Sequence, residues 1–554
     1  MGALLTLQDV ARAKQFYERG YWRSETLYDV LRQWAETTPD RFAFRDSNTR
    51  LTYGAALQWV DAIAQELDEA GLRSGDRVSI WLPSRIETAL IFFACSRMGY
   101  VCNTSLHRDY TCNDILALLK RAGSAAFFAQ SGYGADAAAS NIFALLGGLP
   151  RLKKVYQIET LRSGIAESER PIGLGTIRKG PLSPLTPASN PDRIVYLAFT
   201  SGTTGQPKGV MHSDNTILAN GRAIAKDWAF DQDTIVYSFS PLSHNIGIVG
   251  MAVAAVCGGE FVAHTPLDAS RMLDRIVETG ATYVLGVPTH AMDLLTEMRQ
   301  RGMATLGSVK AFQLGGAPVP PTTVRGLIDV GVKTQNAFGM TENHSFQYTR
   351  PIDLPETIAS TCGRPADGME IKLCREDDPD REVAQGEIGE LGVRGASLML
   401  GYFDDQGATE LSFNRDGWFM TGDLARLDEH GNLQIAGRKK DVIIRGGHNI
   451  YPVRIEDYAL RHTGVAKAAA FPVPDERLGE RVCLAVIPRA NAAPAAPELL
   501  QHLNDQGLSK YDMPEFFLEL DAFPLTASGK VLKRRLVEMV AQGLLKPQPV
   551  RRSG

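Results

Sequence analysis

The segment that decides the fold reads YLAFTSGTTGQPKGVMHS (Tyr196–Ser213), an apolar run followed by glycines, serines and threonines. Glycines allow the backbone to turn its N–H groups toward an anion, and hydroxyl groups add further donors. Lys208 can neutralise part of the charge of that anion. The segment therefore predicts a strand that leads into a phosphate-binding loop.

The spacing of this loop differs from that of a P-loop nucleotide triphosphatase. The Walker A motif, G-x-x-x-x-G-K-[ST], places its lysine directly before a hydroxyl residue. Here Lys208 lies between Pro207 and Gly209. The sequence therefore disfavours a P-loop enzyme.

Strand and helix patterns alternate on both sides of the loop. Short apolar runs at 193–199, 282–288 and 310–316 alternate with amphipathic segments at 269–280, 288–302 and 320–331. This order predicts a parallel sheet with crossover helices, and residues 76–99 repeat it. We therefore predict an α/β fold whose large N-terminal domain contains layered sheets.

The last third of the chain has a different pattern. Residues 386–437 contain short alternating strands with a turn at His430–Asn432, which predicts a small β region. The roughly 115 residues after Gly437 carry helix and strand patterns and suit a separate, smaller α+β domain.

The composition limits the partners and the compartment. The chain has 554 residues and a formal net charge of -4, which provides no global field for nucleic acid or an anionic membrane. Its seven cysteines are scattered without a CxxC pair, and no long apolar run is present. We expect a cytoplasmic protein that binds no nucleic acid and does not insert stably into a membrane.

Three further motifs carry groups that suit a nucleotide. NAFGMTE (336–342) ends on Glu342, a carboxylate of the kind that binds a hard cation. GWFMTGD (417–423) ends on Asp423, whose two oxygens match a vicinal diol. PLTASGK (524–530) ends on Lys530, a mobile ammonium after a glycine.

Together with the loop and with GRKKD (437–441), these motifs resemble those of the adenylate-forming superfamily, which includes the acyl-CoA synthetases. The resemblance runs from Trp22 to Leu536 with the motifs in family order, although Phe338 replaces the family tyrosine. It implies activation of a carboxylate by ATP as an acyl-AMP, with Mg²⁺ on Glu342. It further implies catalytic roles for Thr341, Glu342, His244 and Lys530.

By the same resemblance, ATP contacts residues from both ends of the chain. They are Thr200, Ser201, Gly202, Thr203, Thr204, Gly205, Lys208, Gly316, Ala317, Asn336, Ala337, Phe338, Gly339, Met340, Thr341, Asp423, Arg438 and Lys530.

The resemblance also implies domain rotation, in which a mobile C-terminal lid turns after adenylation. We predict an N-terminal ATP- and acyl-binding domain at 1–437, a hinge at 438–441 that pivots on Lys440, and a lid at 442–554. Gly446, Gly447 and His448 would border the tunnel for coenzyme A (CoA). The family pattern is also compatible with a homodimer and with acetylation of Lys530 by a lysine acetyltransferase.

The predicted acyl pocket is apolar and contains no aspartate, which disfavours an amino-acid substrate. Its residues are His244, Asn245, Gly247, Val287, Gly315, Gly316, Ala317 and Phe338. The chain looks most like bacterial cyclohexanecarboxylate and medium-chain acyl-CoA ligases. We therefore expect a carboxylate–CoA ligase that releases AMP and pyrophosphate and acts on a cyclic or medium-chain acid.

Two alternatives remain at this stage. His244-Asn245 is similar to the pair with which aryl-acid AMP ligases bind a ring hydroxyl before they load a carrier protein. A non-catalytic nucleotide-binding relative is the other alternative, although the motif residues Thr341, Glu342 and Lys530 are intact.

Overall fold

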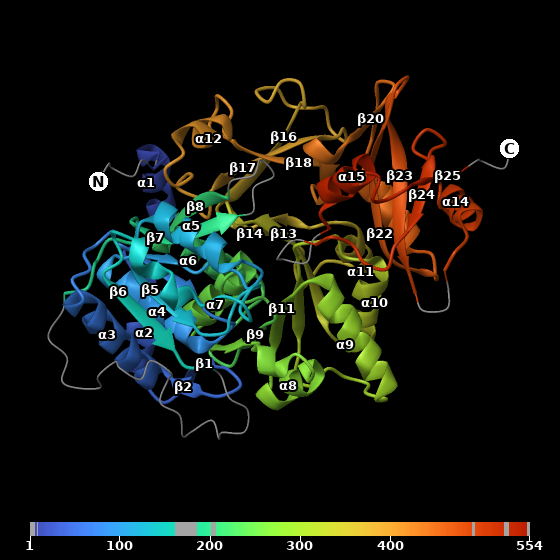
Figure 1. Ribbon diagram of the computed structural model, residues 1–554. Coiled ribbons are helices and arrows are strands. Elements are labelled where there is room, and N and C mark those ends of the chain that lie inside the picture. The colour runs from blue at the N-terminus through green and yellow to red at the C-terminus, as the bar shows by residue number, and fades with distance from the viewer. Residues whose placement is uncertain are drawn as a thin grey trace. The chain divides into compact units, whose positions relative to one another are not determined.

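The computed structural model describes residues 6–7, 9–160, 186–200, 207–489, 493–525 and 531–550. The chain divides into two compact units (Figure 1): Met1–Glu370 with Arg394–Ser412, and Ile371–Val393 with Phe413–Gly554. The small β region, expected in the N-terminal domain, is thus grouped with the C-terminal residues. The boundary at residue 437 concerns where the lid pivots, and it stays a prediction.

The first unit contains a six-stranded sheet in the described part of the chain, with the order β6-β5-β3-β4-β7-β8. Its strands are parallel except β8, which runs antiparallel to β7. The bounds are β3 (Arg77–Trp81), β4 (Val101–Asn103), β5 (Ser124–Gln130), β6 (Lys154–Ile158), β7 (Ile194–Thr200) and β8 (Lys208–Ser213).

A second sheet of this unit has nine described strands in the order β15-β14-β13-β12-β11-β9-β10-β1-β2. Its central strands are parallel, whereas β2, β14 and β15 run antiparallel to their neighbours. The bounds are β1 (Phe42–Arg45), β2 (Arg50–Thr52), β9 (Ile235–Ser238), β10 (Glu260–Ala263), β11 (Tyr283–Gly286), β12 (Ala311–Leu314), β13 (Lys333–Met340), β14 (His344–Tyr348) and β15 (Arg364–Pro365).

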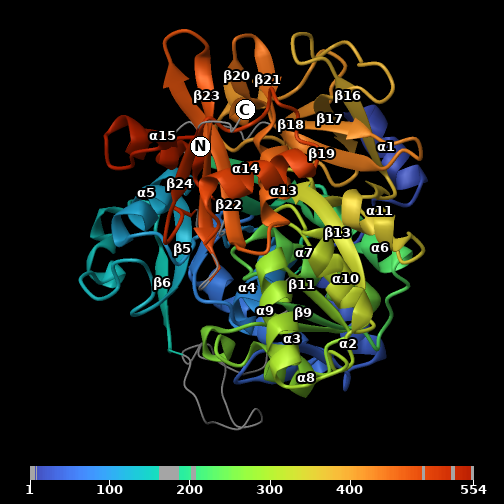
Figure 2. The same cartoon turned by 90° about the vertical axis from the view of Figure 1, so that its right-hand side faces the viewer.

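Helices connect these strands, and α9 and α10 lie side by side against the second sheet (Figures 1 and 2). The α-helices are α1 (Val10–Glu18), α2 (Leu27–Thr37), α3 (Tyr53–Glu69), α4 (Ile86–Met98), α5 (Cys112–Ala122), α6 (Asp214–Asp227), α7 (Asn245–Cys257), α8 (Met272–Thr279), α9 (Pro288–Gln300), α10 (Pro321–Asp329), α11 (Pro355–Ser360) and α12 (Gln406–Leu411). Short 3₁₀ turns are η1 (Ile142–Ala144), η2 (Leu146–Gly148) and η3 (Pro266–Asp268).

Two of these helices, α6 and α7, pack closely, and α7 carries the candidate site residues Asn245 and Gly247 at its N-terminal end. A Cβ on Gly221 of α6 would lie 3.0 Å from the backbone of Ala252 of α7, so glycine permits this approach. Most residues of α7 are buried, which fits a helix that is apolar on all sides. The sequence patterns did not predict either helix.

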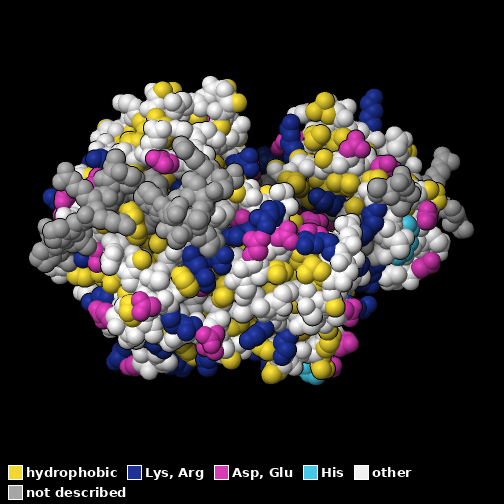
Figure 3. All heavy atoms as spheres, turned by 90° about the horizontal axis from the view of Figure 1, so that it is seen from below, with side chains coloured by type: hydrophobic (Ala, Val, Ile, Leu, Met, Phe, Trp, Pro, Cys, Tyr) yellow, Lys and Arg dark blue, Asp and Glu magenta, His cyan; other side chains and the backbone are white. Residues whose placement is uncertain are grey.

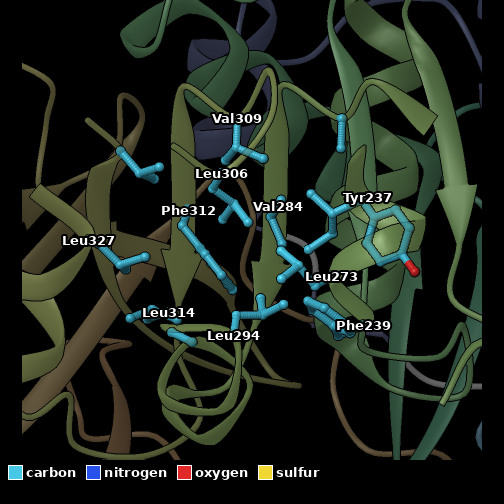
Figure 4. Packing of buried hydrophobic residues seen from close by; sticks show 14 of the residues in the cluster. Tyr237, Phe239, Leu273, Val284, Leu294, Leu306, Val309, Phe312, Leu314 and Leu327 are labelled. Carbon is cyan, nitrogen blue, oxygen red and sulfur yellow. The ribbon is translucent and has the colours of Figure 1, made fainter. Parts of the chain in front are cut away.

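The core under the second sheet combines side chains from strands and helices (Figure 4). Val284 of β11 and Phe312 of β12 lie among Leu273 of α8, Leu294 of α9 and Leu327 of α10. All five side chains are fully buried. This packing fixes the strand ends from which the site residues project.

The second unit contains two sheets in its described residues. A four-stranded sheet has the order β16 (Met369–Cys374), β17 (Gly389–Gly395), β18 (Phe419–Leu427), β19 (Leu433–Arg438), and β18 runs antiparallel to both of its neighbours. The other sheet comprises β20 (Ile443–Arg445), β21 (His448–Ile450), β22 (Val465–Asp475), β23 (Gly479–Pro488), β24 (Phe516–Glu519) and β25 (Gln548–Pro549). The helices are η4 (Lys439–Asp441), α13 (Pro452–Leu460), α14 (Ala496–Asp505) and α15 (Lys533–Ala541).

The predicted fold class is confirmed, with layered α/β sheets in the large unit and an α+β arrangement in the small one. Helix α14 begins inside the small-residue stretch 491–498, which the sequence did not mark as helical.

Positive and negative side chains are interspersed on the face in Figure 3. None of the helices in the described residues is both long and apolar enough to span a membrane.

Leu294→Ala tests the core under the second sheet. The side chain is fully buried, so we expect the free energy of unfolding to fall by about 2–5 kcal/mol in a urea titration. Val277→Ala is the control, because Val277 of the neighbouring helix α8 is 43% exposed. Equal effects of the two substitutions would contradict the assigned packing.

Candidate active site

The two flanks of the predicted phosphate loop lie side by side. Thr200 ends β7 and pairs in register with Lys208, which begins β8, and its hydroxyl donates to the Lys208 carbonyl at 3.4 Å. Ser201, Gly202, Thr203, Thr204 and Gly205 lie outside the described residues. The antiparallel pairing brings both ends of the loop to one point at the sheet edge.

Lys208 and Glu342 meet at Tyr402, a residue that the sequence analysis did not predict. The Lys208 Nζ lies 4.5 Å from the centre of the Tyr402 ring, a cation–π distance. The Tyr402 hydroxyl donates to Glu342 Oε1 at 2.9 Å. Burial, followed by the charge of Glu342, raises the pKa of Tyr402, so its hydroxyl stays a donor at neutral pH.

The segment around Tyr402 reaches this position because it runs beside β8. Phe403 N–H donates to the Gly209 carbonyl, and Tyr402 bridges to Val210. Leu400 and Phe403 are apolar neighbours, so periodicity carries no signal of a polar role for the tyrosine. Only the tertiary fold identifies it.

Thr341 and Glu342 occupy the tight turn between β13 and β14. A Cβ on Gly339 would lie 1.9 Å from the His344 carbonyl oxygen, so this position requires glycine. The Thr341 carbonyl accepts from His212 Nε2 at 2.7 Å, and the Glu342 carbonyl accepts from Met399 N–H at 2.7 Å. The backbone of the turn is therefore held from two sides.

Two residues of the NAFGMTE motif have evident structural contacts. The Asn336 amide donates to the Ile358 and Thr361 carbonyls at 3.0 and 2.9 Å, at the end of α11. Phe338 packs edge-on against Phe346, with ring centres 5.9 Å apart. The Asn336 amide nitrogen thus donates to two carbonyl groups of the protein itself. The role of Asn336 in ATP binding stays a prediction.

Two of the predicted acid-site residues lie where the chain enters α7. His244 occupies the N-cap position of the helix without a side-chain capping bond, and its ring stacks on that of His107 with centres 4.3 Å apart. Burial lowers the pKa of His107 to about 3, and the neighbouring His244 acts in the same direction. The Asn245 amide donates to the Met340 carbonyl at 3.3 Å and accepts from His344 Nδ1 at 2.7 Å.

The loops after β11 and β12 meet the start of α7. A Cβ on Gly316 would lie 3.7 Å from Val287 Cγ1 and 3.8 Å from Ile246 Cδ1. A Cβ on Gly247 would lie 2.4 Å from the Pro241 carbonyl, so this glycine permits a close backbone approach.

The other predicted pocket residues around β12 and β13 form a close-packed strand end. A Cβ on Gly315 would lie 3.1 Å from the carbonyl of buried Ala337. Ala317 is exposed. Gly316 thus lies near Val287 and near Ile246 of α7, and the role of these residues in binding the acid stays a prediction.

In the second unit, Asp423 and Arg438 face each other across β18 and β19. They are in register, and Arg438 Nε donates to Asp423 Oδ1 at 3.0 Å. Asp423 is buried and its backbone N–H donates to the Thr421 hydroxyl. The strand pairing explains how residues 15 positions apart form one polar pair.

The predicted hinge and tunnel residues lie on neighbouring elements of the second unit. Lys440 lies in η4, and burial, assisted by Arg438, lowers its pKa. Gly446 and Gly447 form the turn between β20 and β21 with positive φ of 58° and 85°. His448 Nε2 lies 2.8 Å from Asp512 Oδ1.

Lys530 lies outside the described residues, but the positions around its segment are paired. Leu525 bridges to Val531, and the Lys533 ammonium lies 2.6 Å from Glu456 Oε1. Leu525 and Val531, the described residues on either side of 526–530, are therefore held together.

Glu342 is the predicted magnesium ligand of this site. Among the described residues, no three His, Cys, Asp or Glu side chains are placed to hold a metal together. Mg²⁺ commonly binds through one or two carboxylates plus substrate phosphates. Buried Glu342 beside Lys208 and Tyr402 fits such a site.

Comparison with known proteins assigns the family. The profile of the AMP-binding enzyme family matches residues 31–403, and that of the AMP-binding enzyme C-terminal domain matches residues 454–530. The chain belongs to the AMP-binding enzymes. The predicted membership of the adenylate-forming superfamily is thus confirmed.

Curated relatives of this AMP-binding enzyme cover nearly its whole length. A medium-chain fatty-acid–CoA ligase of Escherichia coli is 30% identical, covering 96% of this chain and 93% of the relative. A 2,3-dihydroxybenzoate-AMP ligase of Bacillus subtilis is 31% identical, covering 96% and 97%. The o-succinylbenzoate CoA synthetase of Bacillus subtilis, solved with its acyl-adenylate, superimposes with a TM-score of 0.77 at 26% identity, covering 92% and 98%.

This AMP-binding enzyme is an AMP-forming acid–thiol ligase that works through an acyl-AMP, as the sequence predicted. A non-catalytic relative is therefore the wrong alternative. The individual residue roles stay predictions.

Tyr402→Phe tests the contact between Tyr402 and Glu342. The ring still faces Lys208, but the hydroxyl donor to Glu342 is lost, so we expect acid-dependent ATP–pyrophosphate exchange about tenfold slower. Tyr402→Leu also removes the ring and should be slower still. Unchanged exchange in Tyr402→Phe would contradict the role of the hydroxyl.

The buried His212 predicts a pH dependence of stability. Burial lowers its pKa to about 4, below the ordinary value of about 6.5, so between these values the unfolded chain binds a proton that the folded chain does not. The contribution is complete above pH 6.5 and is lost as pH falls toward 4, by up to about 3 kcal/mol.

Urea unfolding at several pH values measures this effect. His212→Gln should reduce the loss of stability between pH 7 and 5 relative to the unsubstituted protein. An identical pH dependence in the two proteins would contradict the lowered pKa.

Proposed function

We propose that the chain activates a neutral cyclic or medium-chain carboxylic acid with ATP and transfers the acyl group to CoA. The observation that carries this proposal is the junction at residues 340–342. There the nucleotide motif is hydrogen-bonded both to the start of α7, which would form the acid wall, and to β8, which would form one flank of the phosphate loop.

The chemistry requires positive charge and fixed donors. A carboxylate acylates poorly because its leaving group would be oxide, whereas AMP leaves readily from acyl-AMP. The carboxylate and the α-phosphate on which it acts are both anionic. Preorganised electrostatics and in-line positioning therefore supply most of the rate acceleration in such transfers.

The chain's own residues would meet these needs as follows. Lys208 and the hydroxyls of the 200–205 segment would hold the β- and γ-phosphates that leave as pyrophosphate. Thr341 would contact the α-phosphate, and Glu342 would hold Mg²⁺, which neutralises phosphate charge when bound. Because Gly339 has no side chain, the turn can approach His344 closely enough to present both residues.

Residues of the second unit would act at the ribose and then at the thiol. Asp423, oriented by Arg438, would accept hydrogen bonds from both ribose hydroxyls. Lys530 would bridge the carboxylate and the α-phosphate during adenylation. Rotation at Lys440 would then remove Lys530 and bring the turn at Gly446 and Gly447 to the thiol arm of CoA.

The acid is expected to be uncharged apart from its carboxylate. Val287, Gly316 and Ile246 line the wall, and the motif Pro241–Gly247 contains no acidic residue. Each polar group of the Asn245 amide has a partner inside the protein, which does not favour recognition of a ring hydroxyl. This supports the CoA ligase over the aryl-acid AMP ligase that loads a carrier protein.

Three further expectations concern the setting of the enzyme. We propose a cytoplasmic location and a homodimer, and acetylation of Lys530 as a means of regulation. Acetylation would remove the ammonium charge and so suppress adenylation.

Lys530→Ala tests whether Lys530 acts in adenylation and not in thioester formation. We expect loss of acid-dependent ATP–pyrophosphate exchange, with thioester formation from supplied acyl-AMP largely retained. Lys533→Ala, which removes a nearby lysine paired with Glu456, is the matched control. Equal loss of both half-reactions in Lys530→Ala would reject the assignment.

A panel of acids tests the substrate class. AMP release is measured with cyclohexanecarboxylate, octanoate, benzoate and 2-hydroxybenzoate, each with and without CoA. We expect CoA-dependent release with the first two acids, and no preference for 2-hydroxybenzoate over benzoate. Preference for 2-hydroxybenzoate without stimulation by CoA would support the carrier-loading alternative instead.

A further inference from the structure

His344 adopts a backbone conformation that a residue with a side chain rarely takes. Its φ is 58°, in the left-handed region, at the first position of β14. Glycine would occupy this position without strain. A histidine here costs stability relative to glycine, but its imidazole makes a hydrogen bond that glycine could not make.

The imidazole of His344 lies in a fully enclosed polar contact. Its Nδ1 donates to Asn245 Oδ1 at 2.7 Å, and its ring centre lies 4.1 Å from that of His212. Both rings are buried. The His344 Nε2 has no hydrogen-bond partner among the described residues, which is a further cost to stability.

Asn245, the partner of His344, and His212 itself hold two consecutive carbonyl groups at the turn that carries Thr341 and Glu342. Asn245 donates to the Met340 carbonyl, and His212 donates to the Thr341 carbonyl. His344 orients the Asn245 amide, because the N–H at His344 Nδ1 needs an acceptor and therefore faces the amide oxygen of Asn245. The amide nitrogen of Asn245 then faces Met340.

We propose that His344 is a positioning residue for adenylation: through Asn245 it fixes the start of α7, the acid wall, against the turn that carries Thr341 and Glu342. Displacement of this wall changes the placement of the carboxylate relative to the α-phosphate. A small misplacement of reacting groups is costly in rate. The inference rests on the proposed activation of an acid at this site.

The variants exploit the geometry of the side chain. His344→Ala removes the donor. His344→Asn keeps a donor at about the position of Nδ1 and tolerates the left-handed backbone. His264→Ala is the control for loss of a mostly buried histidine, because His264 pairs with Tyr237 and does not contact the turn.

The readout separates positioning from general destabilisation. His344→Ala should lower kcat/KM for the acid in pyrophosphate exchange about tenfold or more, mainly through kcat, and leave thioester formation from supplied acyl-AMP within about twofold. His344→Asn should recover most of the loss. The double variant with Asn245→Ala should lose no more than Asn245→Ala alone, since the two residues act as one unit.

Several results would overturn the inference. They are equal loss of both half-reactions in His344→Ala, no recovery in His344→Asn, multiplied losses in the double variant, or the same loss in His264→Ala. ATP binding by calorimetry is a second measurement that needs no acid. His344→Ala should bind ATP about threefold or more weakly, whereas His344→Asn should bind it nearly normally.

The two proposals can fail separately. Absence of acid-dependent exchange in the unsubstituted protein would refute the proposed function alone. Unchanged ATP binding in His344→Ala would refute the positioning role.

Discussion

Three consecutive carbonyl oxygens, those of Met340, Thr341 and Glu342, each accept a hydrogen bond from a different part of the chain. The donors are Asn245 at the start of α7, His212 near the end of β8, and the backbone of Met399. The position of the turn is therefore fixed by hydrogen bonds to its backbone. The fold of the large unit brings the three donors together at the turn.

Much of the fold could be predicted because alternating strand and helix patterns carry a strong periodic signal. Strand β11 and helix α9 follow such patterns. Helix α7 escaped prediction because it is apolar on nearly all sides and offers no amphipathic contrast. The strands of residues 386–437 were predicted correctly, but their grouping with the second unit depends on contacts that are distant in sequence.

The residues of the candidate site also fall into two groups, those that a sequence motif indicates and those that only tertiary contacts identify. Glu342 and Asp423 could be proposed from the sequence because each ends a motif with a recognisable order of residue types, and their roles stay predictions. Tyr402 and His344 were missed because their roles depend on partners 60 and 99 positions away. Asn336 shows the converse, since a motif residue assigned to ATP uses its amide to secure α11.

If the carboxylate attacks the α-phosphorus of ATP, one of its oxygen atoms passes to AMP. An acid labelled with ¹⁸O in its carboxylate is supplied together with ATP and CoA, and the nucleotide product is analysed by mass spectrometry. We expect one heavy oxygen in AMP and none in pyrophosphate. Formation of ADP, with the heavy oxygen in inorganic phosphate, would contradict attack at the α-phosphorus.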